Sequence, residues 1–119
     1  MAKLYFRYGA MNSGKSTALL QAAFNYEERG QHVLLAKPEI DTKGADQISS
    51  RLGVERTVDF LIGPEDDARE LFAVHRRRVQ REAEAALVPD VQTDVACLLV
   101  DEAQFLQPQQ IDDLLRVAV

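Results

Sequence analysis

The feature that most constrains this chain is an octapeptide near its start, which matches the pattern G-x-x-x-x-G-K-[ST] at every fixed position. It reads Gly9-Ala10-Met11-Asn12-Ser13-Gly14-Lys15-Ser16. In this pattern, consecutive backbone N–H groups curl around phosphate groups and lead into the positive end of a helix dipole. Gly9 and Gly14 supply the backbone freedom for the curl. Lys15 reaches the β and γ phosphates, and the Ser16 hydroxyl is a Mg²⁺ ligand. We therefore expect a nucleoside triphosphate site here.

The residues on either side of the octapeptide favour this interpretation over a plain turn. Leu4 to Tyr8 before it are aromatic-rich and strand-like. Apolar side chains after it recur at helical spacing, at Leu19, Leu20, Ala23 and Tyr26. Gly30 then predicts the end of the helix. The alternative is a Gly- and Ser-rich turn that merely joins a strand to a helix. The phosphate loop is favoured, because its pattern is convincing when it follows a strand and opens a helix, and both are predicted here.

Composition limits the size and the partners of the domain. With 119 residues, 46% of them hydrophobic and 28% charged, the chain can form one core. A formal net charge of -5 argues against a nucleic acid polymer as partner, because that affinity rests on Lys and Arg neutralising phosphates. No apolar run approaches the length of a membrane span, and the first predicted strand leaves no room for a signal peptide. We expect a cytoplasmic protein without membrane contact.

A second buried strand and a long loop follow the first helix. His32 to Lys37, followed by Pro38, is a nearly continuous apolar run, typical of a parallel strand covered on both faces. Residues 38–58 contain many polar residues and few large apolar ones. They predict a long mobile loop with a short strand near Thr57 to Asp59.

A long helix is predicted next. Gly63 to Asp67 favours a helix start with Pro64 in the first turn, and the helix runs to about Leu87. Its buried face is expected to contain Ala68, Leu71, Phe72, Val79, Ala83 and Ala86. His75 lies on the same side, where an interior packing role is favoured over that of a ligand or a base.

The same helix carries four arginines close together in the sequence. They are Arg76, Arg77, Arg78 and Arg81. A nucleic-acid patch is one interpretation. Because Glu82 and Glu84 lie among them, a solvated charged face is favoured.

An apolar strand that ends in two carboxylates is the second informative site. Cys97 to Val100 is followed by Asp101 and Glu102. Parallel strands present their C-terminal ends to one crevice, so Asp101 is expected opposite Ser16, where it holds Mg²⁺. Glu102 is then available to accept a proton from an attacking hydroxyl or water. A surface acidic pair that closes a strand is the alternative, and the phosphate loop makes it the weaker one.

Three segments together resemble the cytosolic thymidine kinase family, which has a RecA-like core. They are Leu4 to Thr17, Ser50-Arg51-Leu52-Gly53 and Asp101-Glu102-Ala103-Gln104-Phe105. The sequence D-E-x-Q-F after an apolar strand is more discriminating than the phosphate loop, which many unrelated families share. The resemblance implies an α/β fold of the P-loop NTPase type, with a parallel sheet and flanking helices. It also implies that residues 1–119 are one nucleotide-binding domain of this kind, which we expect to be incomplete at its C-terminal side.

The resemblance also implies an activity, the transfer of the ATP γ-phosphoryl to the 5′ hydroxyl of thymidine, which gives dTMP and ADP. Glu102 matches the family's general base. Two segments match the ATP site: Gly9, Ala10, Met11, Asn12, Ser13, Gly14, Lys15 and Ser16, then Asp101, Glu102, Ala103 and Gln104. Met11 and Phe105 match positions that line the thymine pocket, where a thioether and an aromatic face suit a flat methylated base.

Weaker matches lie in the predicted loop. Asp41 and Arg51 occupy positions where the family brings charged groups toward the phosphates. Family members often have Asp-x-Arg at the first position, whereas this chain has Asp41-Thr42-Lys43. A lysine cannot clamp a phosphate bidentately as an arginine does.

The resemblance further implies parts that these residues do not contain. Apolar residues keep helical spacing up to Val119, at Ile111, Leu114, Leu115 and Ala118, so we expect a fragment. The family continues with further core strands, a zinc-bearing subdomain and a loop that wraps the thymidine, and it forms homotetramers. Cys97 is the only cysteine, so it permits no internal disulfide and cannot build a zinc site alone.

Two other functional classes stay open from the sequence. A RecA-type ATPase would use Glu102 to activate water, and it predicts ATP hydrolysis without a nucleoside. A non-catalytic nucleotide-binding module would use the acidic pair for the metal alone, and it predicts ATP binding without chemistry.

Overall fold

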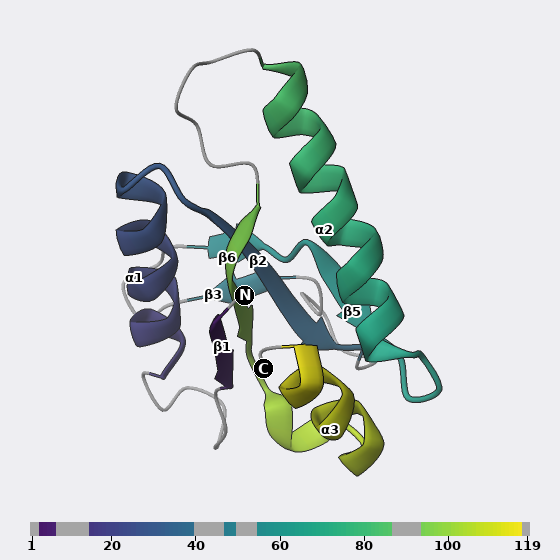
Figure 1. Ribbon diagram of the computed structural model, residues 1–119. Coiled ribbons are helices and arrows are strands. Elements are labelled where there is room, and N and C mark those ends of the chain that lie inside the picture. The colour runs from purple at the N-terminus through teal and green to yellow at the C-terminus, as the bar shows by residue number, and fades with distance from the viewer. Residues whose placement is uncertain (1–2, 7–14, 40–46, 50–54, 87–93, 118–119) are drawn as a thin grey trace.

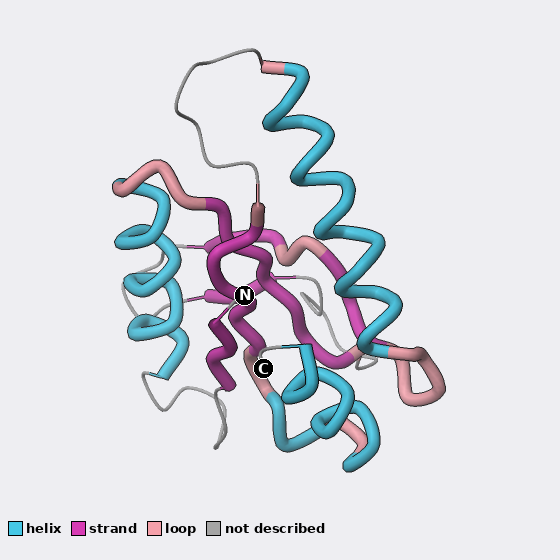
Figure 2. Tube along the Cα trace, in the orientation of Figure 1, coloured by secondary structure: helices cyan, strands magenta, loops and turns pink. Residues whose placement is uncertain are grey.

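The computed structural model describes residues 3–6, 15–39, 47–49, 55–86 and 94–117. Its core is a sheet with helices on both faces (Figure 1). Figure 2 shows the strands between α1 (Lys15–Glu28) and the pair formed by α2 (Ala68–Ala85) and α3 (Pro108–Val117). This is the predicted α/β architecture, a sheet with flanking helices. No described helix has the length and apolarity needed to cross a bilayer.

Four parallel strands form the main sheet, in the order β1-β6-β2-β5. Their bounds are β1 Lys3–Phe6, β2 His32–Pro38, β5 Phe60–Ile62 and β6 Val95–Val100. The β6 strand lies between β1 and β2, so a strand from late in the chain pairs with two strands from its first third. The apolar runs at His32 and at Cys97 are confirmed as parallel strands with helices on both faces.

The end of α1 follows the predicted glycine. Gly30 has a φ of 74°, the left-handed conformation that suits a residue without Cβ. Gly30 N–H donates to the Glu27 carbonyl (3.0 Å), and Gln31 N–H donates to the Tyr26 carbonyl (3.1 Å). This is a Schellman ending, and it turns the chain directly into β2.

The region between β2 and α2 has more structure than the sequence predicts. A two-stranded antiparallel ribbon forms from β3 (Gln47–Ser49) and β4 (Glu55–Thr57), inside the range 38–58 that was predicted as a loop. The predicted strand near Thr57 to Asp59 therefore lies slightly earlier in the chain. The β5 strand, which the sequence did not reveal, joins the main sheet beside β2. Strands of three residues carry too few side chains for a recognisable alternation.

The start of α2 differs from the prediction. Pro64 lies in a turn before the helix, where the Asp66 Oδ2 atom accepts a hydrogen bond from Gly63 N–H (2.8 Å). Asp67 is the N-cap, and its carboxylate accepts from Glu70 N–H (3.1 Å). Asp67 thus satisfies a helix-end donor, which a proline cannot do. The helix ends at Ala85, and Ala86 is exposed, contrary to prediction.

Helix α2 covers the sheet through its predicted apolar face. Ala68, Phe72 and Ala83 are buried, and Leu71 and Val79 pack against the same cluster. His75 packs as predicted, because its ring stacks on Phe60 of β5 with centroids 4.7 Å apart, and its buried Nδ1 atom has no hydrogen-bond partner among the described residues.

The arginines of α2 pair beyond their own helix. Arg76 holds Asp94, which precedes β6, through two hydrogen bonds of 2.7 and 2.6 Å. Arg78 lies 3.5 Å from the Asp59 carboxylate and 3.8 Å from that of Glu82. The predicted solvated face therefore describes only part of this cluster.

The last described helix is held by a buried glutamine. Gln110 of α3 donates through Nε2 to the carbonyls of Gly63 (2.6 Å) and Asp66 (3.0 Å). Its Oε1 atom accepts from Gln107 N–H (3.0 Å) at the start of the helix. Gln110 therefore fixes α3 to the turn before α2, which completes the helical layer on this face of the sheet.

Two buried clusters lie on the two faces of the sheet. Leu34, Ala36, Leu98 and Val100 pack toward α2 and α3. Val33, Leu35, Cys97 and Leu99 pack toward α1, together with Ile48 of β3. Successive residues of a strand point to opposite faces, so each central strand supplies both clusters.

Candidate functional site

The acidic pair predicted from the sequence follows β6 at one edge of the sheet, where the central strands end. Phe6 of β1 is in register with Val100 of β6, which is in register with Ala36 of β2. Asp101 follows Val100 directly, and its N–H donates to the Ala36 carbonyl (3.0 Å). The ends of three parallel strands therefore meet at the position where α/β proteins of this type bind ligands.

The strand and the helix that the phosphate-loop prediction requires are both present. The β1 strand ends at Phe6, and Lys15 and Ser16 form the first turn of α1. A strand and a helix thus flank the octapeptide, as its interpretation requires. Residues 7–14 lie outside the described residues, and they include Met11 and both loop glycines.

The two carboxylates after β6 are both buried. Asp101 is 2% exposed and Glu102 is 5% exposed. Carboxylates are rarely this buried, because removing a charge from water is costly unless hydrogen bonds or opposite charges compensate. Such burial argues against the alternative of a surface acidic pair that merely ends a strand.

Glu102 has an unusual backbone conformation. Its φ of 56° and ψ of 37° lie in the left-handed region, where a residue with a Cβ is disfavoured. A conformation of this kind costs on the order of 1–3 kcal/mol and occurs often at functional sites. It turns the chain sharply from β6 into the short helix η1 (Ala103–Phe105).

Gln104 orients the Glu102 side chain. The Gln104 Nε2 atom donates to Glu102 Oε2 at 2.8 Å. Glu102 is also fixed through its backbone, since its carbonyl accepts from Phe105 N–H (3.1 Å). Ala103 is buried beneath this turn, and the Phe105 side chain is 53% exposed. An exposed aromatic ring beside a buried carboxylate is available for contact with a flat ligand.

Lys37 is a residue of this edge that the sequence analysis did not single out. It is buried near the end of β2, and its Nζ atom donates to the Gln47 carbonyl of β3 (2.7 Å). By strand alternation it continues the face of Val33 and Leu35, toward α1. Lys37 therefore ties the β3–β4 ribbon to the sheet edge that carries Asp101. The signal was a lysine inside an otherwise apolar run.

Asp101 fits the requirements of a magnesium site. Mg²⁺ prefers hard oxygen ligands and is usually held by one or two carboxylates together with substrate phosphates. Asp101 supplies a buried carboxylate at the edge where α1 begins. Within the described ranges, no group of three or more His, Cys, Asp and Glu side chains could hold a metal by itself. Cys97 is buried in the middle of β6.

Two predicted phosphate-side residues, Asp41 and Arg51, lie outside the described residues, as does Lys43. Their positions in the chain flank β3, which Lys37 fixes to the core.

Comparisons with known proteins point to a single family. The family model described as "Thymidine kinase" matches residues 2–118. A curated thymidine kinase of Idiomarina loihiensis is 46% identical over 99% of this chain and 54% of its own length. The thymidine kinase of Ruegeria pomeroyi is 45% identical over 98% of this chain and 52% of its own. That of enterobacteria phage T4 is 41% identical over 98% and 53%.

No solved structure matches the chain in the corresponding comparison. The chain spans about half the length of the curated relatives it matches. Its match to the family nevertheless runs through both the strand–loop–helix unit and the acidic turn after β6. The chain belongs to the thymidine kinase family.

Proposed function

We propose that the protein containing this chain transfers the γ-phosphoryl group of ATP to the 5′ hydroxyl of thymidine, which gives dTMP and ADP. The observation that carries the proposal is the acidic turn, in which a buried Glu102 is aimed by its backbone and by Gln104. Phosphoryl transfer needs little covalent chemistry from the protein, so positioning and charge stabilisation dominate. The curated relatives named thymidine kinase support the choice of acceptor.

In this proposal the residues at the sheet edge share the binding of ATP, Mg²⁺ and thymidine. The loop Gly9 to Ser16 holds the phosphates of ATP through its N–H groups and Lys15. Ser16 and Asp101 hold Mg²⁺, which neutralises phosphate charge when bound. Asp101, Glu102, Ala103 and Gln104 also form the second ATP-contacting segment. Met11 and Phe105 contact the thymine ring.

Glu102 acts as the general base. Its carboxylate accepts the proton of the 5′ hydroxyl as the oxygen attacks the γ-phosphorus, and the bond from that phosphorus to the β,γ-bridging oxygen breaks to release ADP. The hydrogen bond from Gln104 to Oε2 helps to hold this carboxylate in one orientation. Asp41 and Arg51 are proposed to act on the phosphate side of the site.

Substitution of Glu102 tests the proposal in the complete protein. Glu102→Gln removes the proton acceptor and keeps the shape of the side chain. We expect kcat to fall by about 10²–10⁴-fold, the usual contribution of a general base, with ATP binding retained. The measurement is formation of labelled dTMP from thymidine, together with the ATP dissociation constant. Glu84→Gln, an exposed acidic residue of α2, is the matched control and is expected to be neutral.

The outcomes separate the three functional classes. Turnover that survives Glu102→Gln would contradict the assignment of the base. ATP hydrolysis that does not depend on thymidine would favour an ATPase. ATP binding without any transfer would favour a non-catalytic module. Zinc binding, a homotetramer and a cytoplasmic location stay predictions for the complete protein. Metal analysis, light scattering and cell fractionation test them.

A further inference from the structure

Helices α2 and α3 lie on the face of the sheet opposite α1 (Figure 1). Residues of both helices line a pocket that is rich in arginine. Its volume is about 420 Å³. Arg69, Arg76 and Arg77 of α2 line it, and Arg116 comes from the last turn of α3. Four of the ten arginines of the chain therefore surround one pocket. The described lining includes no acidic side chain.

The charge of this pocket is opposite to that of the whole chain. The formal net charge is -5, yet Arg69 and Arg116 form no ion pair within the described part of the chain. Arg77 lies 3.8 Å from the Glu70 carboxylate, and both side chains are well exposed. An exposed pair at this distance contributes little and exchanges easily for another anion. The pocket thus holds at least two positive charges in excess of their partners.

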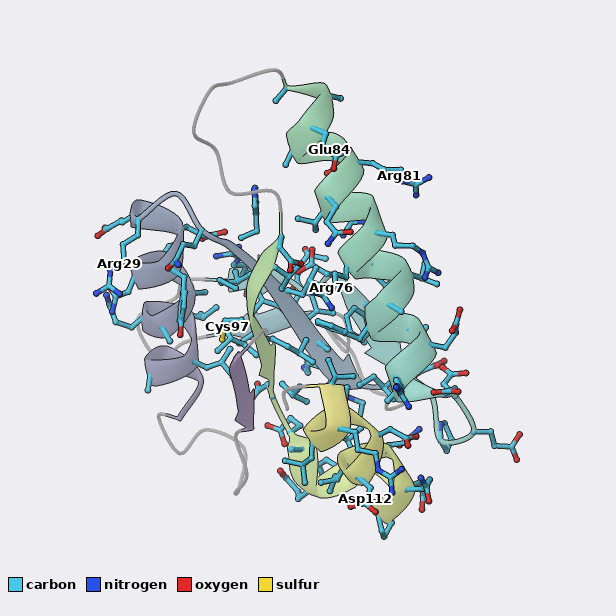
Figure 3. The ribbon with its side chains drawn as sticks, in the orientation of Figure 1. Arg29, Arg76, Arg81, Glu84, Cys97 and Asp112 are labelled. Carbon is cyan, nitrogen blue, oxygen red and sulfur yellow. The ribbon has the colours of Figure 1, made fainter. Side chains whose placement is uncertain are left out.

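Hydrogen bonds fix one of the pocket's arginines, Arg76. Arg76 uses its Nε and Nη2 atoms for the two hydrogen bonds to Asp94. Gln80, which also lines the pocket, donates to the same Asp94 Oδ1 atom (3.1 Å). These bonds orient the Arg76 guanidinium without a ligand. Figure 3 shows Arg76 extending toward the sheet, whereas Arg81 of the same helix points away from it.

Part of the pocket lining is apolar. It includes Phe72, Ala73 and Val117, and Phe72 belongs to the buried cluster of the sheet. Small-molecule pockets have volumes of about 300–1,000 Å³ and combine an apolar surface with a few polar groups that fix orientation. Arginine in particular matches phosphate through its planar array of donors.

We propose that this pocket binds a small organic phosphate, with the phosphoryl group between Arg69, Arg77 and Arg116 and the organic part against Phe72 and Val117. The negative charge of the whole chain disfavours a nucleic acid polymer as the ligand. The proposal is independent of thymidine phosphorylation, because none of these residues belongs to the edge formed by Asp101 and Glu102.

Calorimetric titration with phenyl phosphate tests the proposal in the complete protein. The titration uses a Lys15→Ala background, so that the phosphate loop does not dominate the signal. We expect the double variant Arg69→Ala/Arg116→Ala to bind at least tenfold more weakly than that background protein. Arg81→Ala removes an exposed arginine of α2 outside the pocket, and it is expected to leave the affinity unchanged. Affinity should also fall as salt increases.

Chemical modification gives a second measurement on the unsubstituted protein and needs no variant to fold. Phenylglyoxal modifies accessible arginines, and mass spectrometry reports each site. Phenyl phosphate is expected to slow modification of Arg69 and Arg116 and to leave Arg81 unaffected. Equal modification with and without phenyl phosphate overturns the proposal. So does equal affinity of the double variant and the Arg81 control, or the absence of binding, as when another part of the complete protein covers the pocket.

Discussion

At the scale of single residues, the acidic turn after β6 shows how two neighbouring carboxylates acquire different tasks. Asp101 still belongs to the sheet, because its N–H bonds to the Ala36 carbonyl. Glu102 leaves it through a left-handed conformation. The strain of this conformation is local, whereas burial and the bond from Gln104 hold the carboxylate in one orientation. A proton acceptor needs such an orientation, because misplacement by about 1 Å costs on the order of 10² in rate.

Gln104→Ala removes the amide that orients Glu102. We expect kcat to fall by about tenfold to a hundredfold, since the carboxylate gains other rotamers, and loss of the proposed ATP contact of Gln104 to raise the KM for ATP separately. Steady-state kinetics of the complete protein provide the measurement. Gln109→Ala, which removes an exposed glutamine of α3, is the control and should match the unsubstituted protein. A raised KM for ATP with an unchanged kcat would show instead that Gln104 only contacts ATP.

At the scale of elements, helix α2 is coupled to the sheet through a histidine. His75 stacks on Phe60 of β5 in a partly buried position. Burial lowers the pKa of His75 below its ordinary value of 6.5, the charge of Arg78 lowers it further, and Asp59 acts against this shift. The neutral ring is therefore the form that suits the folded state. Protonation would place a charge between α2 and β5.

The stability of the protein should consequently depend on pH through His75. Because folding lowers this pKa, the unfolded chain binds more protons than the folded one, and stability falls as the pH drops below about 6.5. His75→Phe keeps an aromatic ring against Phe60 and removes the titration. We expect its free energy of unfolding in urea to fall less than that of the unsubstituted protein between pH 7.5 and 5.5. An equal fall in both proteins would contradict the role of His75.

At the scale of the whole molecule, two separate clusters hold the sheet between its helices. The cluster under α2 and α3 includes Phe72 and residues of three strands, and the cluster under α1 includes Ile48 of the β3–β4 ribbon. Single domains are stable by only about 5–15 kcal/mol. Loss of one large side chain from either cluster is therefore significant for the entire fold.

Phe72→Ala should lower the free energy of unfolding by about 3–5 kcal/mol, because it leaves a cavity beneath α2. Phe72 is only 2% exposed, whereas Phe24 of α1 is 41% exposed. Phe24→Ala is thus the matched control, with an expected loss below about 1 kcal/mol. Urea unfolding of both variants checks the difference. Similar losses would mean that the cluster under α2 does not dominate stability.

Particular residues show how far the sequence could predict this structure. The strand before the octapeptide, the helix after it and the stop at Gly30 are local patterns, and all three were predictable. The start of α2 was placed too early, because Pro64 resembles a first-turn proline while the capping atom belongs to Asp67. The β4 strand was predicted slightly too late in the chain, and the strands β3 and β5 were too short to show a pattern, so that only pairing with a neighbour defines them.

The sequence by itself determined the family and predicted the phosphate loop and the acidic pair, because each of these depends on residue types at fixed local spacing. Only the tertiary structure decided that β6 lies between β1 and β2, that Lys37 is fixed to the β3–β4 ribbon, and that arginines of α2 and α3 share one pocket. Such contacts join segments far apart in the chain. They depend on which buried faces pack together, and no local spacing specifies that choice.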